Sequence, residues 1–119
     1  MMNERFKDNA IVKMTFDYSL RIIEFSDELF EKRRFALGDQ LLRSGCSIGA
    51  NVMEAQNAES KADFIHKMKV AAKEANENEY WLLLCKHSKK LPFTDDLLPA
   101  LESIMKVLNK IISTSKRGK

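Results

Sequence analysis

Hydrophobic residues recur at intervals of three and four positions in four separate stretches of the chain. This spacing is typical of amphipathic helices. The predicted helices cover about residues 13–31, 35–56, 60–90 and 95–112. Four amphipathic helices with short connectors favour an all-α fold, an up-down-up-down antiparallel four-helix bundle. We expect the bundle to span residues 13–112, between an N-terminal arm (residues 1–12) and a basic C-terminal tail (residues 113–119).

The first predicted helix carries two apolar stripes that lie side by side. One stripe consists of Val12, Phe16, Leu20, Ile23 and Phe30, and the other of Tyr18, Ile22, Phe25 and Leu29. Together they make an apolar face that is too wide for a helix with a single neighbour. We therefore expect this helix to contact two neighbours.

A line of polar residues runs along the second predicted helix, beside its apolar stripe. The line consists of Gln40, Ser44, Ser47, Asn51 and Glu54, with Arg43 at its flank. The same helix contains Gly45 and Gly49, and a glycine costs about 1 kcal/mol relative to alanine inside a helix. Because such glycines are typical of places where another backbone comes close, we expect much of the polar line to be covered.

The second and third predicted helices are expected to form a hairpin. Residues 60–63 resemble a capping box, with a hydroxyl at the N-cap and a carboxylate three residues later. Antiparallel pairing around this turn places Ser47 near Ala71 and Arg43 opposite Glu74. We therefore predict that small residues of the two helices meet, and that Arg43 and Glu74 form an ion pair that specifies the register.

Composition is that of a folded domain, with 45% hydrophobic and 31% charged residues. No apolar run approaches the roughly 20 residues that span a bilayer, and the first ten residues lack the apolar core of a signal peptide. Cys46 and Cys85 lie in apolar helical contexts without a CxxC pattern, as expected of reduced thiols. We therefore expect a cytoplasmic protein with no membrane partner.

Patterns that indicate catalysis or metal binding are scarce. His66 follows Asp63 by three residues, but a di-metal bundle needs two such pairs and two further carboxylates. Ser44 and Ser47 have no histidine within reach along their helix, so nucleophilic catalysis has no support. The sequence therefore predicts no catalytic, metal-binding or cofactor-binding residues, no cofactor, and a protein that is not an enzyme.

Basic residues are better candidates for a function. The nucleic-acid candidates are Lys61, Lys67, Lys69 and Lys73 on the third helix and Arg33 and Arg34 in the first turn. Such residues contact phosphates without reading bases. The net charge of +3 is compatible with a nucleic-acid partner but does not require one. The alternative is a solvated face in which lysines pair with carboxylates one turn away, such as Lys73 with Glu77.

Tyr80 and Trp81 begin a run of large residues that continues to Leu84. The run surrounds most of the helix, and a helix that is apolar all round is buried on more than one side. We expect the second partner to be another copy of the chain; the alternative is that the run serves the core alone. The residues assigned to helix pairing or assembly are Gln40, Arg43, Ser44, Ser47, Asn51, Glu54, Glu74, Tyr80 and Trp81.

The chain also resembles a known family. The segments that carry the resemblance are QLLRS (residues 40–44), SIGAN (47–51), EA (54–55) and DF (63–64). They resemble the small bacterial four-helix bundles named for the protein encoded in intervening sequences of large-subunit ribosomal RNA genes. The resemblance implies assembly as a ring, typically a homopentamer, and kinship with the accessory protein of diversity-generating retroelements, which binds nucleic acid and a reverse transcriptase. It supplies no catalytic residues.

The leading hypothesis is a non-enzymatic, ring-forming helical-bundle adaptor. Its expected partners are further copies of itself, RNA or DNA bound through the basic surface residues, and a second protein. The alternative is a protein-only interaction scaffold that binds no nucleic acid.

Overall fold

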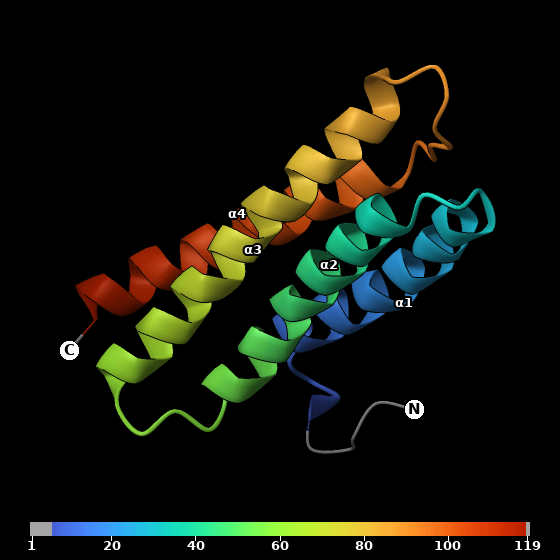
Figure 1. Cartoon of the computed structure of the whole chain (residues 1–119). Coiled ribbons are helices and arrows are strands. Elements are labelled where there is room, and N and C mark those ends of the chain that lie inside the picture. The colour runs from blue at the N-terminus through green and yellow to red at the C-terminus, as the bar shows by residue number, and fades with distance from the viewer. Residues whose placement is uncertain (1–5, 119) are drawn as a thin grey trace.

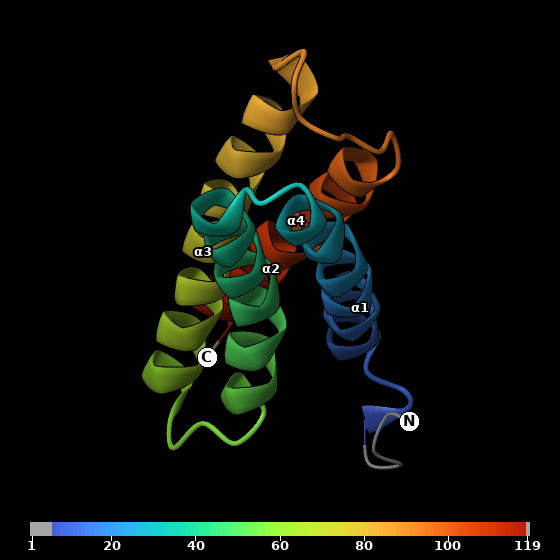
Figure 2. The same cartoon turned by 45° about the vertical axis from the view of Figure 1, so that its right-hand side comes forward.

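The computed structural model describes residues 6–118. Its helices are α1 (Ala10–Glu31), α2 (Phe35–Ala55), α3 (Lys61–His87) and α4 (Leu97–Arg117). Successive helices run in opposite directions, and α4 lies against both α3 and α1 (Figure 1). The predicted antiparallel four-helix bundle is therefore confirmed. In two views the last turns of α3 extend beyond the turn between α1 and α2 (Figures 1 and 2).

The helix ends follow from local capping. Asn9 caps α1, because its side-chain oxygen accepts a hydrogen bond from the Val12 N–H at 3.2 Å. Ser60 likewise accepts from the Asp63 N–H at 3.0 Å, as the capping-box pattern predicts. Helix α1 thus begins three residues before the expected start of the bundle, and α4 continues five residues beyond its expected end. The expected N-terminal arm lies partly outside the described residues, and most of the expected tail is the last turn of α4.

The core contains one of the two apolar stripes of α1. Tyr18, Ile22 and Leu29 are fully buried, whereas Leu20 and Ile23 of the other stripe are 49% and 42% exposed. Helix α1 contacts α2 and α4, so the predicted two neighbours are confirmed. Val12 of the second stripe is also buried, but Leu20 and Ile23 are left uncovered, so α1 retains an apolar surface on the outside of the bundle.

The glycines of α2 permit a close approach to α1. A Cβ at Gly49 would lie 3.3 Å from the Thr15 carbonyl oxygen, and one at Gly45 would lie 2.7 Å from Cγ2 of Ile22. The predicted close approach therefore exists, but on a different flank of α2 from the polar line. For this reason it does not cover that line.

The polar line is covered only in part. Ser44 is buried, Ser47 and Asn51 are half-buried, and Gln40 and Glu54 are exposed. Two of its side chains bond within α2, since Ser47 donates to the Arg43 carbonyl and Asn51 to the Ser47 carbonyl. The expectation that much of the line is covered is correct at Ser44, correct in part at Ser47 and Asn51, and wrong at the two ends, Gln40 and Glu54.

Candidate functional site

A hydrogen-bonded network joins three helices inside the bundle. The Tyr18 hydroxyl of α1 donates to Oδ1 of Asn78 on α3 at 2.5 Å. The Asn78 amide then donates to Oγ of Ser44 at 3.0 Å and to the Leu41 carbonyl at 3.2 Å, both on α2. All three polar side chains are buried, and burial raises the pKa of Tyr18. A phenol held neutral and fully bonded specifies packing and is not available for proton transfer.

A second network crosses the surface between α2 and α3. Arg43 pairs with Glu74 at 3.1 Å, as predicted, and also with Glu77. The Trp81 indole donates to Glu77 at 3.1 Å, and Gln40 accepts from Arg43 at 3.2 Å. Hydrogen bonding and charge from Glu77 and Glu74 raise the pKa of Arg43, and Arg43 lowers that of Glu77. The arrangement specifies the hairpin register and leaves no carboxylate free for acid–base chemistry.

The role of Glu77 was missed by the prediction, although the sequence contains a signal for it. Glu74 and Glu77 are three residues apart, so they lie on the same face of α3. Any pairing that places Arg43 opposite one of them therefore brings the other within reach of the two-pronged guanidinium.

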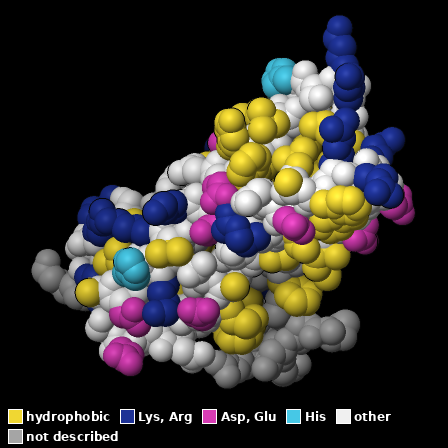
Figure 3. All heavy atoms as spheres, in the orientation of Figure 1, with side chains coloured by type: hydrophobic (Ala, Val, Ile, Leu, Met, Phe, Trp, Pro, Cys, Tyr) yellow, Lys and Arg dark blue, Asp and Glu magenta, His cyan; other side chains and the backbone are white. Residues whose placement is uncertain are grey.

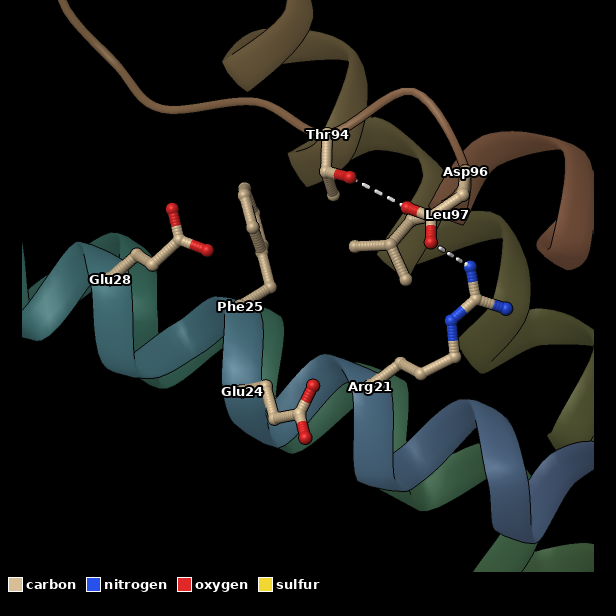
Figure 4. Close-up of a pocket in the computed structure, with 7 residues that line it drawn as sticks. All are labelled: Arg21, Glu24, Phe25, Glu28, Thr94, Asp96 and Leu97. Carbon is tan, nitrogen blue, oxygen red and sulfur yellow. Dashed lines mark hydrogen bonds and ion pairs between the residues drawn. The ribbon is translucent and has the colours of Figure 1, made fainter.

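A small cavity of about 120 Å³ lies between α1 and the start of α4 (Figure 4). Asp96 accepts from Thr94 at 2.6 Å and pairs with Arg21 at 2.5 Å. These two partners lower the pKa of Asp96, so its carboxylate stays ionised at neutral pH. Glu24 and Glu28 line the same cavity without touching Asp96 in the close-up. The cluster ties α1 to α4 and resembles a structural ion pair more than an active site.

The basic candidates divide between the two ends of the bundle. Arg33 and Arg34 lie in the α1–α2 turn, and Lys61, Lys67 and Lys69 lie in the first turns of α3 at the opposite end (Figure 1). The six predicted residues, with Lys73 in the middle of α3, therefore do not form one continuous strip. Arg33 has a left-handed φ of 63°, and its guanidinium lies over the Phe35 ring at 5.9 Å.

The end where α3 begins and α4 finishes gathers basic side chains (Figure 3). Lys69 lies beside Lys116 of α4, and this second ammonium lowers the pKa of Lys69. Lys61 donates to the Gly118 carbonyl, whereas Lys67 pairs with Asp63 at 3.0 Å. We use the name basic end for Lys61, Lys69, Lys116 and Arg117. Lys67 is excluded because its charge is already compensated.

Exposed hydrophobic residues occupy the outer face of α3. Tyr80 is 56% exposed and contacts Trp81 edge-on, with 5.1 Å between ring centroids. Leu83 and Leu84 are 38% and 41% exposed. Figure 3 shows hydrophobic side chains over this part of α3, with lysine and arginine side chains beyond them. We call Tyr80, Leu83 and Leu84 the α3 ridge, and Phe16, Leu20 and Ile23 the α1 flank.

Potential metal ligands and the two cysteine thiols were also located among the described residues. Across residues 6–118, no three His, Cys, Asp or Glu side chains are grouped to hold a metal ion. Burial raises the pKa of the Cys85 thiol to about 11 and also raises the pKa of the half-buried Cys46. Neither thiol is activated as a nucleophile. None of the helices in this part of the chain is long and apolar enough to cross a membrane.

Comparison with known proteins agrees with the fold. The family model described as 23S rRNA-intervening sequence protein matches residues 7–110. The chain belongs to this family. A crystal structure of a protein with unknown function from the S23 ribosomal protein family of Bacteroides thetaiotaomicron VPI-5482 is similar, with 37% identity and a TM-score of 0.79. The match covers 86% of this chain and 97% of that one. No curated protein matched significantly. The predicted relationship to the intervening-sequence protein family is therefore confirmed.

Proposed function

We propose that this member of the intervening-sequence protein family is a cytoplasmic, non-enzymatic adaptor. It assembles into a ring of identical subunits, for which a pentamer is the expected size, and contacts nucleic acid through its basic end. The observation that carries the proposal is the presence of two unlike apolar surfaces on one chain, the α3 ridge and the α1 flank. The expected size comes from the family resemblance.

Two unlike surfaces favour a ring for a geometric reason. Large hydrophobic side chains exposed in neighbouring groups mark places where another surface docks. A two-fold dimer uses the same patch on both subunits and would leave the second apolar surface open to water. A head-to-tail contact uses both surfaces of every subunit, and it generates a closed ring when the rotation between neighbours closes.

The basic end supports a polyanionic partner. Lys69 and Lys116 are held close together although their charges repel, and no carboxylate in the described part of the chain pairs with either. A phosphate between the two ammonium groups would relieve this repulsion. In a ring whose axis runs along the bundles, the basic ends of all subunits would share one face, so weak individual contacts would add up.

The test compares a double variant with a matched control. Lys69→Glu/Lys116→Glu removes the paired ammonium groups, and Lys32→Glu/Lys106→Glu makes the same charge change at exposed positions elsewhere. Binding to a structured RNA probe is measured between 50 and 200 mM salt. Each lost phosphate contact lowers the slope of log K against log salt by about 0.7–0.9. We therefore expect the first variant to bind about tenfold more weakly at low salt, with a slope smaller by roughly 1.5, and the control to bind like wild type.

A protein-only scaffold is the second candidate, and the pairing of Lys67 with Asp63 favours it. The same titration separates the two functions. Binding that is undetectable at 50 mM salt, or equally weak in both variants, would reject the nucleic-acid contact. A second protein would then be the partner of the assembled ring.

A further inference from the structure

We propose that the α3 ridge of one subunit docks on the α1 flank of the next, with the two helices parallel and with opposite charges aligned beside the apolar contact. This inference rests on the ring assembly proposed above. It adds the identity of the two contacting surfaces, their relative direction and the charged groups that select the pairing.

The first argument concerns position along the bundle. Helices α1 and α3 run in the same direction, and the bond between Tyr18 and Asn78 connects them. The exposed residues of the α1 flank at Leu20 and Ile23 follow directly after Tyr18, and the α3 ridge begins two residues after Asn78. Both surfaces therefore extend from this bond toward the end of the bundle that contains the α1–α2 turn. A symmetry axis along the bundles preserves that direction, so neighbouring subunits bring the two surfaces together.

The second argument concerns charge on α1. Beyond the flank, α1 carries four exposed carboxylates: Glu24, Asp27, Glu28 and Glu31. Across residues 6–118, none of the four forms an ion pair within its own chain. The C-terminal half of α1 therefore has an uncompensated negative surface next to its exposed apolar residues.

The α3 ridge has the opposite environment. From Tyr80 to Thr94 the chain contains no acidic residue, and Lys86, Lys89 and Lys90 are exposed and form no ion pair among the described residues. Glu79, Asp95 and Glu102 line a cavity beside Leu83 and Lys86, so the excess of positive charge lies at Lys89 and Lys90. Pairing ridge with ridge would bring these lysines together, and pairing flank with flank would bring carboxylates together. Such like-charge juxtapositions disfavour a pairing. The ridge-to-flank pairing instead brings Lys86, Lys89 and Lys90 toward the four carboxylates of α1.

An apolar groove enlarges the surface available on the α1 side. It lies between α1 and α2, has a volume of about 230 Å³, and is lined by Phe16, Ser19, Gly49 and Met53 among others. Since Gly49 has no side chain, the groove remains open beside Thr15 of α1. The recess extends the flank from Phe16 toward the start of α1, and the α3 ridge lies level with the other part of the flank, Leu20 and Ile23.

The test uses two variants that each destroy one surface. Leu84→Asp places a charge on the ridge, and Leu20→Asp places one on the flank; both side chains are more than 40% exposed in the single chain, so the fold should tolerate the change. We expect each variant alone to be a monomer of 13.7 kDa. Mixed in equal amounts, the two variants retain one intact ridge and one intact flank, and should form a one-to-one dimer and nothing larger. Light scattering after size exclusion measures each mass.

The outcomes separate the interface from the proposed function. Leu20→Asp chains that still assemble alone, or a mixture that stays monomeric, would overturn the ridge-to-flank contact while a wild-type ring would stand. A monomeric wild-type chain would overturn both. Asn109→Asp, on the exposed side of α4, is the matched control and should assemble like wild type. Circular dichroism verifies folding, and the milder Leu20→Ser and Leu84→Ser replace any variant that unfolds.

Charge reversal supplies an independent test in the same assay. Two double variants reverse the charges on one side each: Asp27→Lys/Glu31→Lys on α1 and Lys89→Glu/Lys90→Glu after α3. Each should raise the subunit concentration needed for half-assembly at least tenfold. A chain with all four changes should recover most of that loss, because the opposite charges are then exchanged across the contact. Reversals that leave assembly unchanged, or a fourfold variant no better than the two double variants, would overturn the charge pairing.

Discussion

Replacing Asn78 with leucine tests the buried network that joins three helices. The substitution changes volume little, but it removes the acceptor for the Tyr18 hydroxyl and the donor to Ser44 and Leu41. Ser44 still bonds to the Gln40 carbonyl at 2.7 Å. The Tyr18 hydroxyl, fully buried, loses its partner.

The expected cost follows from these bonds. A buried polar group left without a partner costs about 1–3 kcal/mol, and each ordinary hydrogen bond contributes about 1 kcal/mol. Asn78→Leu should therefore lower the free energy of unfolding by about 2–4 kcal/mol. Tyr18→Phe leaves Oδ1 of Asn78 unpaired and should cost about 1–3 kcal/mol. In the double variant neither the Tyr18 hydroxyl nor Oδ1 of Asn78 is left buried without a partner, because both are absent. Its loss of stability should therefore be smaller than the sum of the two single losses, by about 1–3 kcal/mol.

The assay is urea unfolding followed by circular dichroism at pH 7. One fixed subunit concentration is used for all four proteins, because self-association adds stability that grows with the logarithm of concentration. Additivity of the two substitutions to within about 0.5 kcal/mol would show that Tyr18 and Asn78 are not coupled, and would refute the network as the determinant of how α1, α2 and α3 pack.

Three further predictions concern stability and reactivity. Gly45→Ala should destabilise the bundle by about 1–3 kcal/mol in thermal unfolding despite its better helix propensity, because the new Cβ would lie 2.7 Å from Ile22; equal or higher stability would contradict the close packing of α1 and α2. The raised pKa of Tyr18 means that the unfolded chain loses its phenolic proton first, so stability should fall as pH rises above about 10, by up to about 1.4 kcal/mol per pH unit. Tyr18→Phe should reduce that slope in urea titrations at pH 9–11. With a thiol-specific reagent at pH 8, Cys46 should react before Cys85, whose pKa of about 11 and complete burial protect it; faster labelling of Cys85 would contradict its burial.

The hairpin of α2 and α3 could be predicted from the sequence because local signals specify it. Ser60 caps α3, so the turn position is defined, and antiparallel geometry then sets which residues face each other. The pairing of Arg43 with Glu74 followed from that register alone. Capping and helical period act over a few residues, which is why sequence patterns reveal them.

Long-range features were less accessible. Two apolar stripes on α1 do not reveal which one is buried, and the partner that accepts the Tyr18 hydroxyl inside the bundle, Asn78, lies 60 residues further along the chain. Asn78 interrupts the apolar register of α3 in the sequence, yet it is the centre of the network. The nearness of Lys69 to Lys116 depends on how the connector of residues 88–96 positions α4. Pro92 in that connector marks a break, but it does not define the register of α4 beforehand.

The conformation of the α1–α2 turn could not be predicted from the sequence either. It contains neither glycine nor proline, and Arg33 takes the left-handed conformation that glycine usually provides after a helix. The sequence therefore predicted a break from charge alone, and the conformation that makes the turn could not be inferred. The candidate site could not be predicted for a similar reason. The basic residues are divided between two ends of the bundle, and this division depends on how the four helices pack together.

The absolute mass of the wild-type chain, measured by light scattering across a range of concentrations, tests the ring assembly most directly. A closed ring predicts one discrete mass, expected at five times the 13.7 kDa of a single chain and unchanged on dilution until the ring dissociates. A particle of 13.7 kDa at every concentration, or a two-fold dimer that does not grow, would contradict the ring.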